Sequence, residues 1–531
     1  MKRCPQCRRD YYDERLLFCL DDGERLLDGP ASMEEPSTLL ISDAGSDPSG
    51  SSFGESLPGN NERVDISKSD GGNSIAVLPL VNTSSDSENE YFCDGLADEL
   101  TSALAKIDGL KVAARTSTFR FKGANTDIVE IGQKLGVRSV LEGSVRKFGG
   151  RLRISIQLVN VTDGYHLWSE RYDRELQDIF EIQDEITLSV VRALKLKLFG
   201  GKRAEVLKRY TDNAEAYQHY LRGRYYYASR TKEDLIKGID SFEQAVKVDP
   251  GFALAYAWIA DAYASMPAYP YLASNEAFPR SQAAAKRALE TDPSLAEAHT
   301  AMAYSLAVFD WDWIGAEREF QRAIELDPDG YETHYRYGLL YLAVTGRHSE
   351  AIAEMQRALE IEPLSLITGA NLVAVYLYAG ENEMALAQAR TTYELDPDFL
   401  VGRYFLGLAY SVNGMYAQAI DLCETVLRTD PANQLMLRVA GHAYAGSGRH
   451  REAENVIAKF NQIADTQYVV SYYQAAIYSS LGDTDQAFAR LENAFAQRDW
   501  ELHRLKVDPF MRPLRSDPRF KEMLERLRLS E

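Results

Sequence analysis

The sequence predicts a multidomain protein in which a superhelical array of paired α-helices follows a small α+β domain with a mixed sheet. Three observations predict this arrangement: a dipeptide that recurs at a nearly fixed interval, an alternation of strand and helix patterns before it, and a polar linker near the N-terminus. With 531 residues, the chain is also too long for one compact domain, so several folded units are expected.

The recurring dipeptide is Asp-Pro, or once Glu-Pro, in the C-terminal half of the chain. Its six copies are separated by 43, 35, 35, 34 and 34 residues, at Asp249-Pro250, Asp292-Pro293, Asp327-Pro328, Glu362-Pro363, Asp396-Pro397 and Asp430-Pro431. A period of about 34 residues is typical of a solenoid of helix-turn-helix units. Proline ends the second helix of each unit, because it has no N–H to donate and restricts the residue before it.

Small residues keep fixed places within each unit. A Gly or Ala precedes a Tyr by three residues in the first helix of six units, at Gly223, Ala260, Gly338, Gly407, Gly441 and Ala475. The small side chain lets two helices approach closely, and the Tyr fills the groove beside it. The longest interval contains Pro267, Pro270 and Pro279, which predict a loop between the two helices of the second unit. Unrelated helices with accidental Asp-Pro pairs would not repeat these internal positions.

The pattern resembles the tetratricopeptide repeat, whose spacing Gly407, Tyr410 and Pro431 reproduce in one unit. We count about eight units in residues 211–497 and expect residues 498–531 to cap the last of them. The resemblance implies a right-handed superhelix whose concave wall is lined by the first helix of each pair. Such a wall is a long groove that suits an extended peptide or a partner helix.

Residues 74–199 predict a separate α+β domain. Strand and helix patterns follow one another in the order β-α-β-α-β-β-β-α, from the apolar strand "SIAVLPLVN" to the closing helix "LQDIFEIQDEITLSVVRALKLKL". Gly149-Gly150 and Asp163-Gly164 supply hairpin turns between the last three strands. This order predicts a mixed sheet packed on helices.

Residues 74–190 resemble the TolB amino-terminal-like domain, which often precedes tetratricopeptide arrays in bacterial cyclase-like and transcriptional regulators. The matching stretches include "IAVLPLVNTSSDSENEYFCDGLADEL", "ARTSTFRFKG" and "LGVRSVLEGSVRKFGGRLRISIQLVNVTDGYHLWSERYDRELQDIF". The resemblance implies an accessory or sensory domain without known catalysis, so it indicates architecture more than activity.

Residues 1–27 predict a zinc-ribbon-like segment. Cys4 and Cys7 form a C-x-x-C knuckle, Cys19 follows, and Asp22 stands where a ribbon would place a fourth Cys or His. Three thiolates in a reducing compartment suit Zn²⁺ better than disulfides, and Asp22 offers an oxygen ligand. The segment resembles the short zinc ribbons that begin many bacterial signalling proteins. The alternative is a ribbon remnant that folds weakly, or not at all, without metal.

Residues 28–73 predict a disordered linker. They are rich in Ser, Gly, Asp and Pro and have no sustained apolar period. Such a stretch buries too little apolar surface to offset the conformational entropy that ordering it would cost.

Composition and motifs argue against several classes of protein. The net charge of -20 argues against a general nucleic-acid binder, because such proteins present a basic surface. No apolar run is long enough to cross a bilayer, and "MKRCPQCRRD" has no apolar segment behind it, so we expect a cytoplasmic protein. Phosphate-loop, zinc-protease, nucleophile-elbow and kinase motifs are all missing from the sequence, which predicts a protein that is not an enzyme.

These observations predict a scaffold that binds a partner protein in the concave groove of the repeats. Tyr220, Arg224 and Tyr227 share one face of a helix and are candidate partner-binding residues, since Tyr and Arg dominate interface energetics. The alternative is that this face packs onto the preceding domain. Two further functions stay open: a regulatory component of a nucleotide cyclase or kinase pathway, and a transcriptional regulator that acts through the N-terminal ribbon.

Overall fold

The structure is a computed structural model of the chain. It describes residues 73–86, 89–124, 126–196 and 206–530, together with three short N-terminal strands. The chain divides into two compact units, Met1–Asp65 and Ile66–Glu531. In the first unit, β1 (Lys2–Arg3) pairs antiparallel with both β2 (Asp10–Tyr11) and β3 (Leu27–Asp28).

The zinc site predicted for the first unit lies outside the described residues. None of its four candidate ligands, Cys4, Cys7, Cys19 and Asp22, belongs to the part of the chain that the structure describes. The same holds for almost all of the linker expected in residues 28–73. The zinc ribbon and the linker therefore stay predictions.

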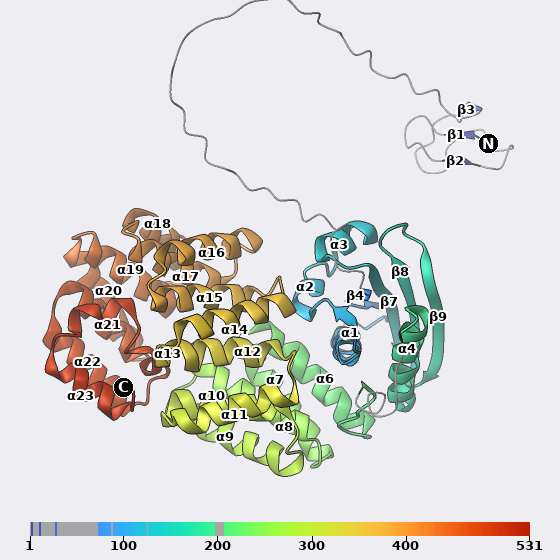
Figure 1. The fold of residues 1–531 in the computed structure, drawn as a ribbon, viewed down its shortest axis with the longest axis horizontal. Coiled ribbons are helices and arrows are strands. Elements are labelled where there is room, and N and C mark those ends of the chain that lie inside the picture. Colours follow the sequence, from blue (N-terminus) through green and yellow to red (C-terminus); the bar gives the residue numbers. More distant parts are fainter. Residues whose placement is uncertain are drawn as a thin grey trace, which may run out of the picture. The chain divides into compact units, whose positions relative to one another are not determined.

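A six-stranded mixed sheet opens the second unit (Figure 1). The main order is β6-β4-β7-β8-β9, and the short β5 pairs with β7. Strand β4 runs parallel to β6 and β7, whereas β7, β8 and β9 form an antiparallel meander. The strands are β4 (Asn73–Val77), β5 (Val81–Asn82), β6 (Leu110–Val112), β7 (Ser139–Phe148), β8 (Arg151–Asn160) and β9 (His166–Glu175). The predicted mixed sheet is confirmed.

Helices pack on both faces of this sheet, because the buried residues of β4 alternate between them. Ile75 and Val77 join the core formed with α1 (Glu90–Ala105) and α4 (Ile179–Ala193), while Ala76 faces α3 (Ile128–Leu135). The short helix α2 (Arg115–Phe119) follows β6. The core on the α1 side continues without a break into the first repeats of the solenoid. The α+β domain and the start of the array are therefore one packed body.

Eight consecutive helix pairs occupy residues 214–496 (Figure 1). The first helices are α6 (Ala214–Ser229), α8 (Ala253–Ser265), α10 (Ala296–Ser305), α12 (Tyr331–Tyr337), α15 (Leu366–Ala379), α17 (Leu400–Val412), α19 (Gln434–Gly446) and α21 (Ser471–Leu481). The second helices are α7 (Lys232–Val248), α9 (Ser274–Thr291), α11 (Trp313–Leu326), α14 (His348–Ile361), α16 (Asn382–Leu395), α18 (Tyr416–Leu427), α20 (His450–Ile463) and α22 (Thr484–Ala496). Short segments η5 (Leu306–Asp310), η6 (Gly338–Leu342) and α13 (Ala343–Thr345) prolong α10 and α12. The helical solenoid predicted from the 34-residue period is confirmed.

Glycines hold neighbouring helices at close range. A Cβ atom added to Gly407 would lie 2.6 Å from Val439, and one added to Gly441 would lie 2.5 Å from Ile477. These contacts join α17 to α19 and α19 to α21, which are first helices of successive repeats. Because a Cβ does not tolerate such distances, a larger residue at either position would push the repeats apart.

The second repeat differs from its prediction in the position of one proline. Its extra residues form a 3-10 turn, η4 (Met266–Ala268), and a short connection, but Pro279 lies inside α9 rather than in the loop. A proline in the second turn of a helix removes one backbone hydrogen bond, because it has no N–H to donate. The helix continues through it, since Ala277 and Phe278 on the same segment are fully buried.

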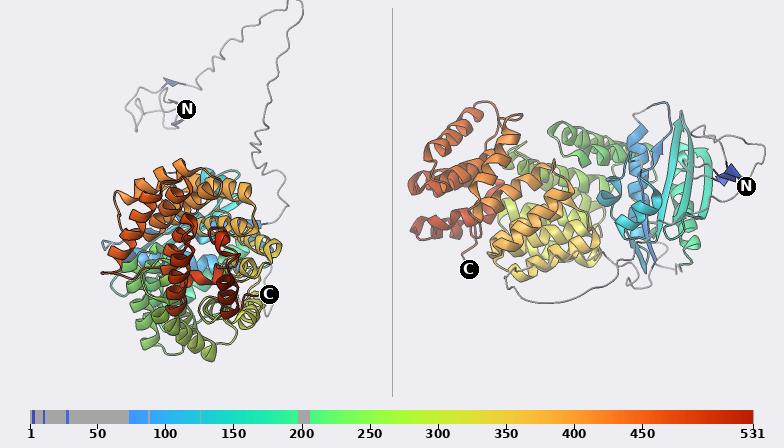
Figure 2. Two further views of the ribbon diagram at one scale, coloured as in Figure 1. Left: turned by 90° about the vertical axis from the view of Figure 1, so that its left-hand side faces the viewer. Right: turned by 90° about the horizontal axis from the view of Figure 1, so that it is seen from above.

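The C-terminal segment is only partly the predicted cap. Helix α23 (Pro518–Arg526) packs against α22, and Arg526 Nη1 lies 2.6 Å from Glu492 Oε1. Within residues 498–531, this helix is the part that forms the expected cap. The preceding η7 (Trp500–Arg504) and η8 (Pro509–Leu514) instead enter the concave side of the array (Figure 2). Charged side chains usually lie at a solvated surface, but those of this segment find buried partners inside the superhelix.

Contacts of the third repeat with the eighth repeat and with the C-terminal segment close the array on itself. The rings of Trp311 and Phe495 stack with centroids 5.0 Å apart. The indole N–H of Trp500 donates to the hydroxyl of Tyr304 at 2.8 Å, and that of Trp313 donates to the carbonyl of Leu527 at 2.9 Å. The array therefore curves around an axis that the C-terminal segment crosses.

Among the helices that the structure describes, none combines the length and the apolar composition that a membrane span requires.

Replacing Gly441 with Ala is expected to destabilise the array by about 1–3 kcal/mol, because the new methyl group would overlap Ile477. Thermal unfolding followed by circular dichroism measures the loss as a lower Tm. Gly150→Ala is the matched control, since no heavy atom lies within 4 Å of its added Cβ and its backbone is not left-handed. Equal melting temperatures for the two variants would contradict the close-approach argument.

Candidate functional site

A hollow with about 730 Å³ of empty space, part of it open to solvent, lies on the concave side of the array. Each of the eight repeats lines it from its first helix or the residue that ends that helix, through Arg230, Ser265, Tyr304, Arg336, Asn371, Tyr404, Leu435 and Tyr473. Segment η7 contributes Trp500, Glu501 and Arg504. We call this space the central hollow.

The wall of the central hollow combines three kinds of group. Apolar side chains come from η6, α15 and α17, including Leu340, Ile367 and Phe405. Tyrosine hydroxyls and guanidinium groups supply hydrogen-bond donors, and Glu501 is the one carboxylate among the described lining residues. Mostly apolar walls with a few placed polar groups are typical of sites that orient a bound molecule.

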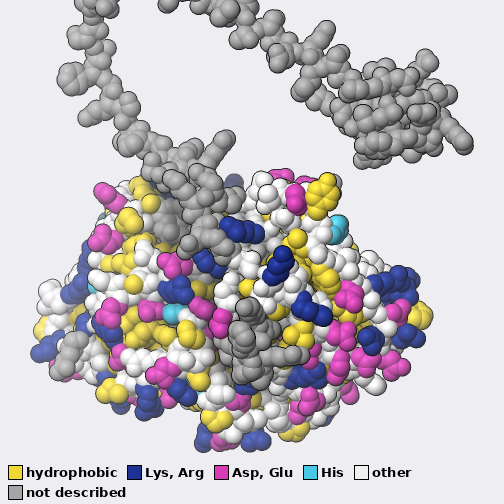
Figure 3. All heavy atoms as spheres, turned by 45° about the vertical axis from the view of Figure 1, so that its right-hand side comes forward, with side chains coloured by type: hydrophobic (Ala, Val, Ile, Leu, Met, Phe, Trp, Pro, Cys, Tyr) yellow, Lys and Arg dark blue, Asp and Glu magenta, His cyan; other side chains and the backbone are white. Residues whose placement is uncertain are grey.

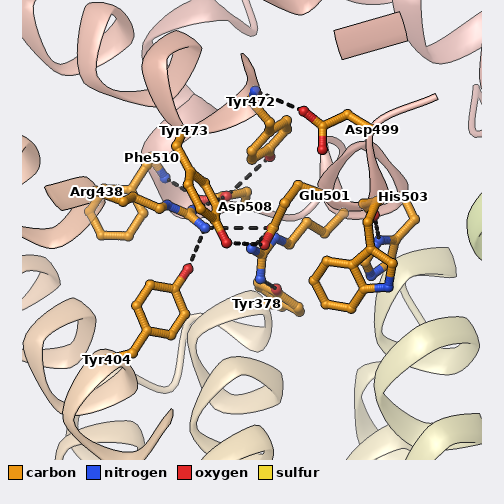
Figure 4. Close-up of polar contacts among 12 residues, drawn as sticks. Tyr378, Tyr404, Arg438, Tyr472, Tyr473, Asp499, Glu501, His503, Asp508 and Phe510 are labelled. Atoms are coloured by element: carbon orange, nitrogen blue, oxygen red, sulfur yellow. Dashed lines mark hydrogen bonds and ion pairs between the residues drawn. The ribbon is translucent and has the colours of Figure 1, made fainter. Parts of the chain in front are cut away.

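A cluster of buried charges built around Arg438 borders the hollow (Figure 4). The Arg438 side chain is 1% exposed, and its Nη2 donates to Asp508 Oδ2 at 2.8 Å. Its Nη1 donates to the hydroxyl of Tyr404 and lies 3.6 Å from Glu501. Burial alone would raise the pKa of Asp508, but the Arg438 and Arg504 guanidiniums hold it below its usual range. The carboxylate therefore stays ionised in the interior.

Tyrosines complete the cluster. The hydroxyl of Tyr472 donates to Asp508 at 3.1 Å, and that of Tyr473 donates to Glu501 at 2.8 Å. Arg504 pairs with Glu501 on the same turn of η7 and donates to the hydroxyl of Tyr378 at 3.1 Å. These contacts tie the C-terminal segment to three first helices, α15, α19 and α21, as Figure 4 shows. The C-terminal segment is therefore held in place as part of the wall of the central hollow.

Burial shifts the pKa values of two histidines and one carboxyl beside the cluster. Burial lowers the pKa of His442 to about 3 and that of His503 to about 4. His442 stacks on Phe510 with ring centroids 4.0 Å apart. Burial raises the pKa of Asp499 to about 7, although its carboxyl accepts the backbone N–H of Tyr472 at 3.2 Å. Asp499 is therefore the group of this region that titrates near neutral pH.

A second polar group lies at the opposite end of the array, around Asp261 on α8. One Asp261 oxygen accepts from Arg336, which is 2% exposed, and the other accepts from the hydroxyl of Tyr227. Arg230 stacks on the Tyr227 ring at 4.1 Å from its centroid, and its Nη1 lies 3.4 Å from the hydroxyl of Ser265. Of the arginines that line the hollow, Arg336 and Arg504 therefore each pair with a carboxylate.

Arg230 differs from those two arginines. No carboxylate lies within 4.0 Å of its guanidinium among residues 73–86, 89–124, 126–196 and 206–530. Its backbone adopts φ 57°, the left-handed region that non-glycine residues rarely occupy, and the hydroxyl of Tyr271 donates to its carbonyl at 3.3 Å. A half-buried guanidinium with no carboxylate within 4.0 Å in the described part of the chain, and with Asp261 acting on it only from farther away, is suited to an anionic group in the hollow.

The residues predicted to bind a partner lie in two places. Tyr220 is 1% exposed and accepts from Arg224 at 2.9 Å, while Arg224 reaches Asp98 of α1 at 2.6 Å and stacks on Trp258. Both therefore pack at the junction with the α+β domain, as the alternative interpretation of this face expected. Tyr227 is also buried, but its contact with Asp261 places it beside the central hollow.

Sequence reasoning missed most residues of the hollow, although the period carries a signal for some of them. Tyr404 and Arg438 are 34 residues apart and touch, as are Tyr227 and Asp261. Aligning the units would have shown polar pairs one period apart at the same place in the first helix. Asp508 follows no such rule, because it lies after the last repeat.

Within the described residues, no three His, Cys, Asp or Glu side chains are grouped so that they could hold a metal ion. Of the charged side chains that line the hollow, Glu501 and Arg504 pair with each other, and Arg336 pairs with Asp261 beside it.

Comparison with known proteins supports the two parts of the second unit. Residues 312–365 and 371–434 match the model of the tetratricopeptide repeat. These matched stretches, which lie within the third to seventh helix pairs, are similar to tetratricopeptide repeats. Residues 71–189 match the model of the second domain of HilA/YgeH-like transcriptional regulators. The TolB-like character of this domain stays a prediction, since its match is to that second family.

A Rhizobium meliloti (strain 1021) protein named "Putative adenylate cyclase 3" is 42% identical over 184 residues. The match spans 35% of this chain and 31% of that relative, so the chain covers about a third of the relative's length. A tetratricopeptide protein of Thermus thermophilus is 20% identical, with a TM-score of 0.31 over 36% of this chain and 98% of its own. The human IFIT1 dimer is 14% identical, with a TM-score of 0.41 over 60% and 77%.

Replacing Arg438 with Met is expected to destabilise the protein by about 3–5 kcal/mol, because Asp508 and Glu501 would keep buried charges without their shared partner. Urea unfolding measures the loss. Arg449→Met is the matched control: it removes an exposed pair with Glu452, and the expected change is below about 1 kcal/mol. A loss for Arg438→Met no larger than that of the control would contradict the cluster's structural role.

Replacing Asp499 with Asn is expected to change how stability depends on pH. The neutral Asp499 carboxyl is favoured by the fold, so its contribution is fully present below its ordinary pKa of 3.8 and is lost as pH rises through about 7. The wild type should therefore lose about 2–3 kcal/mol between pH 5 and pH 8 that the Asn variant keeps. Melting temperatures across this range test it, with exposed Asp465→Asn as control. A parallel pH dependence of Asp499→Asn and wild type would contradict the assignment.

Proposed function

We propose that this chain is a non-enzymatic scaffold that holds a segment of a partner protein in the central hollow. The observation that carries the proposal is the wall of that hollow, to which every repeat contributes from its first helix. Tetratricopeptide folds are typically non-catalytic and present their first helices to peptides and proteins. The mixture of apolar, hydroxyl and guanidinium groups suits a segment with both apolar and acidic side chains.

The end of the hollow near α6 and α8 is where the partner segment enters in this proposal. Segment η7 and the charge cluster around Arg438 occupy another part of the wall, against α15, α19 and α21. Near α6, Arg230 offers a guanidinium with no described carboxylate within 4.0 Å, beside the lining residue Tyr269. An acidic side chain of the partner would form a charge-assisted hydrogen bond with Arg230. Apolar neighbours in the partner would pack against Leu340 and Ile367.

The setting we propose is bacterial signalling or regulation in the cytoplasm. The match of residues 71–189 to a domain of transcriptional regulators supports a regulatory setting. In this proposal residues 1–27 form a ribbon in which Cys4, Cys7, Cys19 and Asp22 bind a structural Zn²⁺. The α+β domain acts as an accessory module that is packed on the array.

A regulatory part in a nucleotide cyclase pathway is the second candidate. It is favoured by the 42% identity to the relative named as a cyclase, over a stretch that is only 31% of that relative. A transcriptional role through the ribbon is the third. It receives less support, because the net charge is -20 and the face in Figure 3 mixes acidic with basic side chains.

Filling the hollow should abolish partner binding. Asn371→Trp places a large side chain in the wall, whereas Met384→Trp places the same side chain on the half-exposed surface of α16. Each full-length tagged protein is used to capture proteins from source cells, which are then identified by mass spectrometry. We expect a set of proteins retained by wild type and Met384→Trp but lost with Asn371→Trp, and bound at least about tenfold more weakly by Arg230→Gln.

Arg357→Gln, which removes an exposed arginine of α14, is the control for Arg230→Gln. Retention of the same proteins by Asn371→Trp would overturn the scaffold proposal. Loss with Asn371→Trp but full retention by Arg230→Gln would keep the scaffold and reject an acidic anchor.

A further inference from the structure

Strand β9 is an open edge of the six-stranded sheet (Figure 1). It spans ten residues, pairs with β8 on one side, and contains no proline. In the part of the chain that the structure describes, no backbone hydrogen bond joins its outer side to another element. A long edge of this kind is a template for pairing with another strand.

The central residues of β9 carry charges in a particular order. Glu170 and Arg171 precede Tyr172, and Asp173 and Arg174 follow it. Tyr172 is 3% exposed and points into the core, while the four charged residues are exposed. The sequence on either side of Tyr172 is thus acid, base, then acid, base.

This order is self-complementary in an antiparallel pair. If β9 lies against a second β9 with Tyr172 opposite Tyr172, then Glu170 faces Arg174 of the second copy and Arg171 faces its Asp173. The two-fold symmetry repeats both contacts, which gives four opposite-charge pairs across the strands. Directly opposed side chains lie on the same face of the sheet, about 5 Å apart at their Cβ atoms.

Neighbouring registers are repulsive, which makes this one specific. A shift of one residue in one direction places Arg171 opposite Arg174 and Glu170 opposite Glu175. A shift in the other direction places Glu170 opposite Asp173. Like charges directly opposite one another destabilise a strand pair, whereas opposite charges stabilise it.

Contacts within the chain leave these groups able to pair. Among the described residues, neither Glu170 nor Arg171 has an ion pair within 4.0 Å; Glu170 accepts only from the Tyr172 hydroxyl, at 3.1 Å. Arg174 lies 3.6 Å from Glu185, and both side chains are about half exposed. Asp173 accepts from Arg151 and Arg153, but a carboxylate has sites for a further donor.

Charges on an edge strand often serve the opposite purpose, which is to prevent pairing. Edges protected in this way carry charged side chains, prolines, bulges or a short strand. The one irregularity in the pairing of β9, opposite Leu158 and Val159, lies at its N-terminal end and leaves the central residues regular. Alternating signs attract a second copy in one register, so protection does not explain their order.

We propose that β9 pairs antiparallel with β9 of a second copy of this chain about Tyr172, which makes the two sheets continuous in a homodimer. The surface does not include the central hollow, because no residue of β9 lines it. This inference is therefore independent of the scaffold function.

Charge reversal tests the register directly. The full chain is studied by analytical ultracentrifugation at low and at physiological salt. We expect wild type to dimerise, more weakly at high salt. Glu170→Arg alone and Arg174→Glu alone each create two like-charge contacts and should weaken the dimer at least about tenfold. An equimolar mixture of the two variants should form a heterodimer as tight as wild type, because every reversed residue then meets an opposite charge.

Glu394→Arg, a reversal on the exposed surface of α16, is the control and should leave the dimer unchanged. Circular dichroism confirms that each variant is folded. A wild type that is monomeric up to high protein concentration would overturn the proposal. So would a dimer that neither reversal weakens, or a mixture that does not recover.

Discussion

The ion pair between Arg438 and Asp508 determines what kind of solenoid this protein is. Both charges are taken out of water, which costs several kcal/mol for each ion and is offset only where the geometry satisfies both groups. Here tyrosine hydroxyls and a second arginine complete the cluster, so the C-terminal segment has one place to lie. The pair acts together with apolar side chains of the same segment, such as Leu502, Leu505 and Met511, which are buried in the core of the array. The groove of an ordinary open superhelix is therefore reduced to the central hollow.

Closure of the array has a consequence for recognition. Trp311 of the third repeat contacts Phe495 of the eighth, and Tyr304 of the third repeat accepts from Trp500 of η7, so these contacts join parts of the chain that are far apart in the sequence. A partner cannot lie along the whole inner wall, since η7 and the charge cluster occupy one end of it. The remaining contact surface is short, and its specificity must come from a few groups. An arginine without a described carboxylate partner, next to tyrosines and aliphatic side chains, is the most selective of them, because its charge remains to be satisfied.

The parts of the fold that could be predicted from sequence are those that repeat or alternate. The 34-residue period predicted the helix pairs, and alternation with turn glycines predicted the mixed sheet, because each of these signals is local and recurs. Pro279 was misjudged because the burial of neighbouring side chains overrode the local preference of a proline. The burial of Asp508 inside the array was not predicted at all, because nothing in the local sequence indicates its partners. The face containing Tyr220 and Arg224 was ambiguous, since an interface with another domain and one with another protein use the same residue types. Which polar residues meet across the axis depends on the curvature of the whole array, and no single repeat encodes that curvature.

The two surfaces of the second unit can work together because a continuous buried core lies between them. Arg224 of the first repeat reaches Asp98 of α1, and the core of the α+β domain is continuous with that of the first repeats. Two chains joined at β9 would therefore hold their hollows at a fixed separation. A partner with two binding segments, or one that is itself a dimer, would engage the second hollow at a high effective concentration once the first is bound. Weak recognition through a short hollow then becomes sufficient, and the strength of the assembly depends on pairing at the sheet edge as much as on the contact with Arg230.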